Sequence, residues 1–319
     1  MTGGAGYIGA HVVRSLQQQG MTPVVLDDLS SGLARFVPAG VPFVQADIND
    51  TAAVAATMRE HGCVGVIHVA GYKYAGVSVQ RPLHTYTQNV TGTASVLAAM
   101  EAADVNHIVF SSSAAVFGTP DTELVTEDSP TRPESPYGES KLIGEWLIAD
   151  VAKARPGFTG VSLRYFNVVG SATDAVYDAS PHNLFPLVIE ALLAGRTPRI
   201  NGVDYPTPDG TCVRDYVHVG DLADTHVAAA QALLASRALK PAYNLGSGTG
   251  LSVRQIMDAM AEVSGVAFTP EIAPRRPGDP ARIVADGSAA AADLGWKMSY
   301  SLAQMVSSAW SARTASGPA

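Results

Sequence analysis

The chain has 319 residues, of which 47% are hydrophobic and 16% are charged, so it can build one large domain or two of moderate size. Its formal net charge is -8, and no basic stretch stands out, so we expect no nucleic acid partner. An anionic ligand would have to be held by a few well-placed cations, because the overall charge of the protein does not attract it.

No apolar run reaches the roughly 18 residues that a membrane-spanning helix requires, and no signal peptide precedes the first motif. We therefore expect a cytoplasmic protein that makes no contact with a membrane. The two cysteines, Cys63 and Cys212, lack the spacing of metal ligands or of a disulfide framework. They predict two reduced thiols and no metal site.

In the first half of the sequence, short apolar runs alternate with amphipathic stretches. This alternation predicts an α/β protein with a Rossmann-type, doubly wound parallel sheet and helices on both faces. The predicted strands are residues 23–27, 43–47, 64–70, 107–111 and 161–165. The predicted helices include residues 52–60 and 89–103.

After about residue 167 the alternation weakens, and glycine and proline become frequent between residues 170 and 210. We interpret this change as the start of a smaller domain that completes a cleft. The predicted division is therefore a Rossmann domain over residues 1–167 and a second domain over residues 168–319, partly interleaved with the first.

A glycine-rich run opens the chain, and it contains G-x-G-x-x-G as Gly4, Gly6 and Gly9, with Gly3 beside it. A helix that starts here would direct backbone N–H groups and its positive end at a pyrophosphate. Asp27 lies 18 residues beyond Gly9, at the end of the next predicted strand. An acid there can bind ribose hydroxyls and repels a 2′-phosphate, which favours NAD over NADP. The alternatives are a flexible turn and a helix-capping aspartate.

Only Met1 and Thr2 precede the glycine run, although this fingerprint normally follows a strand. The first strand of the sheet is therefore predicted to be almost absent. If the chain begins at Met1, we expect a weakened sheet centre and poorer retention of NAD.

The motif Y-x-x-x-K occurs as Tyr137 and Lys141, and Pro136 suits the first turn of a helix. The spacing of four places both side chains on one face of that helix, where the ammonium would lower the pKa of the phenol. The serine run 111–113 follows a predicted strand at the edge of the sheet where such folds bind ligands. A serine, a tyrosine and a lysine beside a nicotinamide indicate a hydride-transfer site.

Across nearly its whole length the sequence resembles the UDP-glucose 4-epimerases of the extended short-chain dehydrogenase/reductase family. The matching landmarks are residues 2–9, 110–114, 137–141, 164–167, 205–207, 209–211, 213–216, 243–246 and 274–276. So many ordered motifs are far more specific than any one of them. The resemblance implies that the first domain binds NAD and that the second binds a nucleotide sugar.

The resemblance also implies roles for individual residues. Tyr137 would be the acid and base at the sugar O4, Ser113 would hydrogen-bond that oxygen, and Lys141 would hold the nicotinamide ribose. The expected cofactor-binding residues are Gly3, Gly6, Tyr7, Ile8, Gly9, Asp27, Asp47, Ile48, Lys73, Asn89, Tyr137 and Lys141. The expected substrate-binding residues are Ser113, Tyr137, Asn167, Asn183, Leu184, Arg214, Tyr216, Arg276, Asp279 and Ile283.

The implied activity is NAD-dependent epimerisation at C4 of a UDP-sugar through a 4-keto intermediate. A small residue at the position of Ile283 goes with acceptance of N-acetylated sugars in this family, so the bulky isoleucine favours UDP-glucose and UDP-galactose. Asn201 stands where the family often has an aromatic residue against the uracil, which leaves the base preference open. The family also forms homodimers through two long helices, here matched by residues 89–103 and 138–153.

Three alternatives remain. The chain could epimerise another nucleotide sugar, such as an N-acetylated sugar or a pentose. A 4,6-dehydratase of the same fold would need an Asp-Glu pair where Ala114 and Ala115 stand, so dehydration is disfavoured. A non-catalytic NAD-binding sensor is disfavoured by the intact Tyr137, Lys141 and Ser113.

Overall fold

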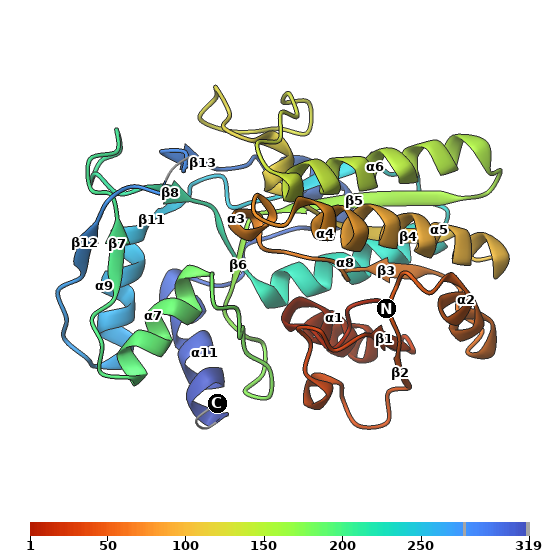
Figure 1. The fold of residues 1–319 in the computed structure, drawn as a ribbon, viewed down its shortest axis with the longest axis horizontal. Coiled ribbons are helices and arrows are strands. Elements are labelled where there is room, and N and C mark those ends of the chain that lie inside the picture. Colours follow the sequence, from red (N-terminus) through yellow and green to blue (C-terminus); the bar gives the residue numbers. More distant parts are fainter. Residues whose placement is uncertain (277–278, 317–319) are drawn as a thin grey trace.

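The computed structural model describes residues 1–276 and 279–316. Its main sheet is parallel and has the order β2–β1–Thr2–β3–β4–β5–β10, because Thr2 forms bridges with both neighbouring strands. Figure 1 shows this sheet with helices on both faces, which confirms the predicted Rossmann-type architecture. The strands are β1 (Val25–Asp27), β2 (Phe43–Gln45), β3 (Val66–His68), β4 (His107–Ser113), β5 (Thr159–Tyr165) and β10 (Ala242–Leu245).

As the sequence predicts, the first strand is almost absent, and it is reduced to the bridging residue Thr2. Its N–H donates to the carbonyl of Ile67 at 3.1 Å, and its own carbonyl accepts from Val69 at 3.2 Å. On the other side, the N–H of Leu26 donates to the carbonyl of Met1 at 2.9 Å. The short central strand gives β1 and β3 few backbone partners, and both are shorter than the sequence pattern predicts. β4 instead pairs along its whole length with the seven-residue strand β5 and extends to Ser113.

Two layers of helices cover the sheet. On one face, α1 (Tyr7–Gln18) packs against α8 (Val219–Leu234), and α8 also contacts β4 and β5. On the other face lie α2 (Thr51–Glu60), α5 (Gly92–Ala102) and α6 (Pro136–Ala154). The predicted helix at residues 89–103 begins instead with a π-helical turn, Thr87–Thr91, that leads into α5. Two short helices, α3 (Ala75–Ser78) and α4 (Pro82–Tyr86), precede this turn.

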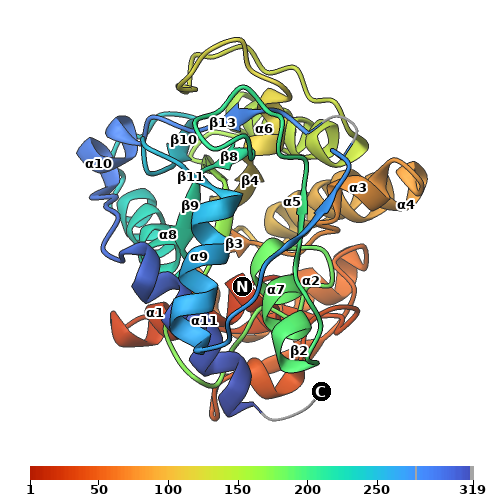
Figure 2. The same cartoon turned by 90° about the vertical axis from the view of Figure 1, so that its left-hand side faces the viewer.

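A second part of the chain lies at the other end of the molecule in Figure 1. Its core packs apolar side chains of α7 (Leu184–Leu193), α9 (Val253–Ser264) and α11 (Leu302–Ala315), the three helices that face the viewer in Figure 2. This part also contains three small sheets. Two of them have two strands each: β6 (Asn167–Val169) with β9 (Tyr216–His218), and β7 (Arg199–Asn201) with β12 (Glu271–Ala273). The third has three strands: β8 (Val213–Arg214), β11 (Leu251–Ser252) and β13 (Arg282–Ile283). The remaining helix is α10 (Ser288–Leu294).

The chain crosses between the two parts more than once. After β9 it returns to the main sheet, where α8 covers one face and β10 pairs with β5. The parts therefore share their elements, and a cleft forms where β4, β5 and the second part meet. A boundary at residue 167 remains a prediction.

Candidate active site

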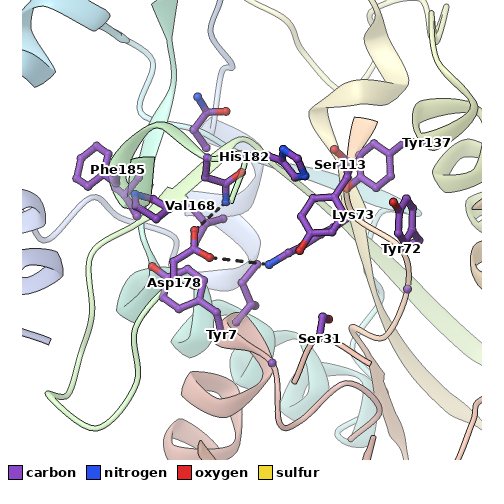
Figure 3. Close-up of a pocket in the computed structure, with 18 of the residues that line it drawn as sticks. Tyr7, Ser31, Tyr72, Lys73, Ser113, Tyr137, Val168, Asp178, His182 and Phe185 are labelled. Carbon is purple, nitrogen blue, oxygen red and sulfur yellow. Dashed lines mark hydrogen bonds and ion pairs between the residues drawn. The ribbon is translucent and has the colours of Figure 1, made fainter. Parts of the chain in front are cut away.

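One large cavity, of about 760 Å³, lies between the carboxyl ends of the sheet strands and the second part of the chain. Figure 3 shows side chains from both parts pointing into it. Of the predicted site residues, 18 line the cavity: Gly3, Gly6, Tyr7, Ile8, Gly9, Asp27, Ile48, Lys73, Ser113, Tyr137, Lys141, Asn167, Asn183, Leu184, Arg214, Tyr216, Arg276 and Asp279. The other three, Asp47, Asn89 and Ile283, are not among the lining residues.

The glycine run forms a tight turn into α1 at one end of the cavity. A β-carbon on Gly9 would lie only 1.9 Å from the carbonyl oxygen of Gly3, so no larger residue fits this turn. The N-cap of α1 is Gly6, which has no side chain to occupy the first N–H groups of the helix. These donors and the positive end of the helix therefore face the cavity, as a pyrophosphate requires.

Asp27 lies at the end of β1, beside that turn, with 6% of its surface exposed. Its Oδ2 accepts from the N–H of Ala5 at 3.0 Å and its Oδ1 from the N–H of Leu29 at 2.9 Å. Burial raises the pKa of this carboxyl, and the two backbone hydrogen bonds oppose that shift. Each oxygen keeps a second lone pair that can accept from a ribose hydroxyl. The turn and Asp27 together fit a dinucleotide that lacks a 2′-phosphate.

Helix α6, which carries Tyr137 and Lys141, starts at the edge of the cavity. Ser135 caps it by accepting from the N–H of Gly138 at 3.2 Å, and Pro136 is its first residue. This start places Tyr137 on the first turn, beside Ser113 at the end of β4, whose hydroxyl opposes the rise in the pKa of the phenol. Lys141 follows one turn later on the same side of the helix.

The electrostatics of this pair differ from the sequence-based expectation. Lys141 is 5% exposed, and its ammonium donates to the carbonyl of Ser111 at 2.9 Å. Burial lowers the pKa of Lys141 to about 8. Burial raises the pKa of Tyr137, and only the hydrogen bond from Ser113 opposes this. The prediction that Lys141 lowers the pKa of Tyr137 is therefore wrong for the ligand-free protein, because desolvation dominates.

At the far end of the cavity, the two predicted arginines are already held by neighbouring side chains. Arg214 donates to Asp279 at 3.0 Å in a largely buried ion pair. The amide oxygen of Asn201 accepts from Arg276 Nε at 3.1 Å and from Nη2 at 3.3 Å. Guanidinium groups fixed in this way suit a diphosphate, whose oxygens accept paired hydrogen bonds.

Asn167 and Tyr216 lie opposite each other, as Cα partners of β6 and β9, on the wall between the two ends of the cavity. The side chain of Asn167 lies close enough to the phenol of Tyr216 to lower its pKa, against the larger effect of burial. Burial is the main reason that the pKa of Tyr216 is raised, so its hydroxyl stays protonated and can donate. A polar wall of this kind can meet a sugar or a ribose from the side.

The three predicted residues outside the cavity have identifiable roles of their own. Asp47 is exposed, and its Oδ1 accepts from the backbone N–H of Asn49 at 2.8 Å and from its side-chain amide at 2.9 Å. Ile283 lies on β13 and packs with an apolar cluster that includes Phe117 and Phe166. The buried Asn89 supports the lysine-bearing segment from behind.

The structure also brings residues to the cavity that the sequence motifs do not single out. Asp178 comes from the loop between β6 and α7, and its Oδ1 lies 3.9 Å from the ammonium of Lys73 (Figure 3). Its Oδ2 accepts from the side-chain amide of Asn183 at 2.7 Å. Tyr74 and His182 pack edge to face beside this pair, with ring centroids 4.7 Å apart. The loop carries no motif, so only a family alignment could have pointed to it.

A sequence profile matches residues 1–246, and it describes the NAD dependent epimerase/dehydratase family. The chain belongs to this family. Ala114 and Ala115 directly follow Ser113, and their methyl groups cannot transfer protons.

Individual family members resemble the chain along almost its full length. A UDP-glucose 4-epimerase from Azospirillum brasilense is 42% identical over 301 residues, which cover 93% of this chain and 86% of the relative. A UDP-glucose 4-epimerase from Stenotrophomonas maltophila has been solved with bound NAD and formylated UDP-arabinopyranose. It is 40% identical to this chain, the match covers 99% of this chain and 97% of the solved chain, and the TM-score is 0.93. The enzyme from Bifidobacterium longum, solved with NAD+ and UDP, is 37% identical, covers 98% and 97% of the two chains, and has a TM-score of 0.90.

Proposed function

We propose that the chain catalyses the NAD-dependent epimerisation of a UDP-sugar at C4, most readily of UDP-glucose and UDP-galactose, through a 4-keto intermediate. The observation that carries this proposal is the place of Tyr137. It lies beside Ser113 in one cavity that has a dinucleotide cradle at one end and two fixed arginines at the other. The relatives from three organisms, two of them solved with NAD and a uridine nucleotide, support the same assignment.

The chain's own residues account for each proton movement. Tyr137 acts in its ionised form: the phenolate takes the proton of the sugar O4 and returns it at the end of the cycle, while Ser113 holds that oxygen by a hydrogen bond. Lys141 remains mostly an ammonium at neutral pH, because its pKa is about 8. It is the cation on the same helical face as Tyr137, and we assign it to the nicotinamide ribose. The chemistry that NAD supplies when bound is reversible acceptance of hydride from C4.

The two ends of the cavity divide the binding of the ligands. The glycine turn, Asp27 and Lys73 hold the cofactor, and Arg214 and Arg276 hold the diphosphate of the substrate. Because the nucleotide is bound firmly, the hexose can be held loosely. Loose binding is required because the sugar must turn over between the two hydride transfers. Ile283 does not line the cavity but packs with Phe166, which does, and we propose that it excludes N-acetylated sugars by limiting how far Phe166 can yield.

We also propose that the chain forms a cytoplasmic homodimer through the face of α4, α5 and α6. Leu83 on α4 is 80% exposed and Trp146 on α6 is 57% exposed, and these two helices pack side by side. Leu142 and Ile148 of α6 are buried in the chain's own core and do not contribute to this face. Within the described residues, no helix has both the length and the apolar character of a membrane span.

Light scattering tests the dimer. Trp146→Glu should shift the protein from dimer to monomer, because a buried carboxylate without a partner opposes association. Ile272→Glu is the matched control, because Ile272 is 56% exposed on β12, at the other end of the molecule. A wild-type monomer would contradict the proposal.

The activity is tested with a coupled assay on UDP-galactose, UDP-N-acetylgalactosamine and UDP-pentoses. Turnover of UDP-galactose supports the proposal, whereas turnover of another sugar alone keeps the mechanism and changes the substrate. Retention of NAD without turnover of any nucleotide sugar would favour the sensor alternative.

A further inference from the structure

Three residues of α6, spaced one turn apart, each face the serine run 111–113 of β4. Tyr137 lies beside the third serine, whose hydroxyl opposes the rise in the pKa of the phenol. Lys141 donates to the carbonyl of the first serine at 2.9 Å. Glu145 accepts from the hydroxyl of the second serine at 2.5 Å. The first two residues belong to the proposed catalytic site, whereas Glu145 does not line the cavity and has no part in the proposed chemistry.

Glu145 is held by a second, stronger contact. Arg164 on β5 donates to its two carboxylate oxygens from Nε at 2.9 Å and from Nη2 at 2.6 Å, and both side chains are only 9% exposed. The guanidinium also donates to the carbonyl of Glu127 at 3.3 Å and lies 5.2 Å from the ring centroid of Phe117. A paired, two-point contact of this kind fixes direction as well as distance.

The helix also lies unusually close to the strand next to this ion pair. A β-carbon on Gly144 would come within 2.6 Å of the ring of Phe110 on β4, so the backbone of α6 rests directly on that ring. Close contact sets the distance between helix and sheet, but a smooth glycine surface does little to stop the helix from sliding or turning. The bonds from Glu145 to β4 and β5 supply that constraint.

We propose that Glu145, anchored by Arg164, is a positioning residue that sets the register of α6 on β4 and so keeps Tyr137 against Ser113. The inference rests on the proposed function, because it explains how the proposed acid and base is aimed. A buried ion pair contributes little net stability compared with apolar residues of the same size, so specificity of position is a physical reason to keep one.

The decisive variant replaces both partners, Glu145→Leu with Arg164→Met, because it removes the pair without leaving an unpaired buried charge. Ser112→Ala is the milder second variant, since it removes only the bond from β4 to Glu145 and leaves the ion pair intact. Glu145→Gln is the conservative variant, because an amide oxygen can still accept from Ser112 and Arg164. Asp104→Asn is the matched control, because it breaks the ion pair at the far end of the same helix, where Arg155 meets Asp104 at 3.2 Å.

Each variant is measured as the NAD-containing enzyme for kcat, KM, NAD content and melting temperature. The double variant should lose roughly ten- to a hundredfold in kcat per bound NAD, as small displacements of catalytic groups do, with KM changed less than about twofold. Ser112→Ala should lose less, and Glu145→Gln should retain most of the activity. A lower melting temperature with unchanged kcat per bound NAD, in both the double variant and Ser112→Ala, would show a merely structural role and overturn the proposal. So would an equal loss of kcat in Asp104→Asn.

A second readout does not depend on turnover. Titration of tyrosinate absorbance, with Tyr137→Phe subtracted, follows the phenol of Tyr137 alone. Since the bond with Ser113 is the contact that opposes the raised pKa of this phenol, the double variant should raise that pKa further. An unchanged Tyr137 titration would overturn the proposal. If the wild-type protein turns over no nucleotide sugar, the proposed function fails, and this titration still decides whether Glu145 positions Tyr137.

Discussion

The ammonium of Lys73 lies 3.9 Å from the Oδ1 of Asp178, and both side chains line the cavity (Figure 3). Lys73 belongs to the segment after β3, and Asp178 to the loop between β6 and α7, so the contact joins the two parts of the chain. The carboxylate also raises the pKa of Tyr7, in the first turn of α1, in addition to the larger effect of burial. An acid therefore stands close to the place assigned to a pyrophosphate.

This relationship predicts that Asp178→Asn tightens the binding of NAD. The substitution frees Lys73 for the pyrophosphate and removes a like charge from its neighbourhood. Because Lys73 is 42% exposed, solvent screens the effect, and we expect about a two- to fivefold slower release of NAD. Stopped-flow fluorescence, with NADH in excess replacing the bound NAD, measures that release. Lys73→Met should do the opposite, and faster release from Asp178→Asn would contradict the assignment of this end of the cavity.

Asp27 is expected to set the choice between the two dinucleotides. Asp27→Asn keeps an acceptor for the backbone of the turn but removes the charge that repels a 2′-phosphate. The ratio of NADP to NAD affinity should rise by roughly tenfold, on the order of 1.4 kcal/mol. Competition between the two dinucleotides in isothermal titration calorimetry measures the ratio. No change in the ratio would mean that the adenosine ribose binds in another part of the cavity.

Asn89 should act on the cofactor through the segment that it supports. Its Oδ1 accepts from the N–H of Tyr72 at 2.6 Å, and its Nδ2 donates to the carbonyl of Tyr72 at 3.0 Å and to the hydroxyl of Ser140 at 2.8 Å. Asn89→Ala leaves these buried groups without partners and should lower the free energy of unfolding by about 1–3 kcal/mol. Urea titration measures that loss. Because Lys73 directly follows Tyr72, NAD should also be retained less well, and unchanged stability would show that the network is dispensable.

Lys141 predicts a specific dependence of stability on pH. Its pKa is lowered to about 8 in the folded protein from 10.5, so between these values the unfolded chain binds the extra proton. The free energy of unfolding therefore rises with pH across this window, by about 3 kcal/mol for this one group, and is independent of it below pH 8. The difference between wild type and Lys141→Met, both freed of cofactor, isolates the effect in urea titrations from pH 7 to 11. If the free energy of unfolding of the wild type instead falls relative to that of Lys141→Met between pH 8 and 10.5, Lys141 stays charged in the folded protein.

Local patterns in the sequence predict the elements and motifs whose physics is local. The turn from Gly3 to Gly9 needs small residues wherever it folds, and the spacing of Tyr137 and Lys141 places them on one side of any helix. Strand positions follow in the same way from apolar runs. The lengths of the strands do not follow from apolar runs. The lengths of β1 and β3 depend on the backbone hydrogen bonds available from the segment between them, which here is Thr2 and its neighbours.

Properties that depend on distant residues could not be read from such patterns. The spacing of Tyr137 and Lys141 says nothing of burial, which raises the pKa of one and lowers that of the other. Asp178 reaches Lys73 only because the loop after β6 folds across the cavity. Glu145 and Arg164 are polar residues in two predicted elements, and only their packing shows that they form a buried pair.

The central claim is that Tyr137 is the acid and base of a nucleotide-sugar epimerase. The most direct test compares wild-type protein and Tyr137→Phe, both loaded with NAD, in a coupled assay that follows the conversion of UDP-galactose to UDP-glucose. The account predicts turnover by the wild type and a loss of roughly a hundredfold or more in kcat in the variant, with NAD and UDP still bound. Equal turnover by the two proteins, or none by a wild type that retains NAD, would contradict it.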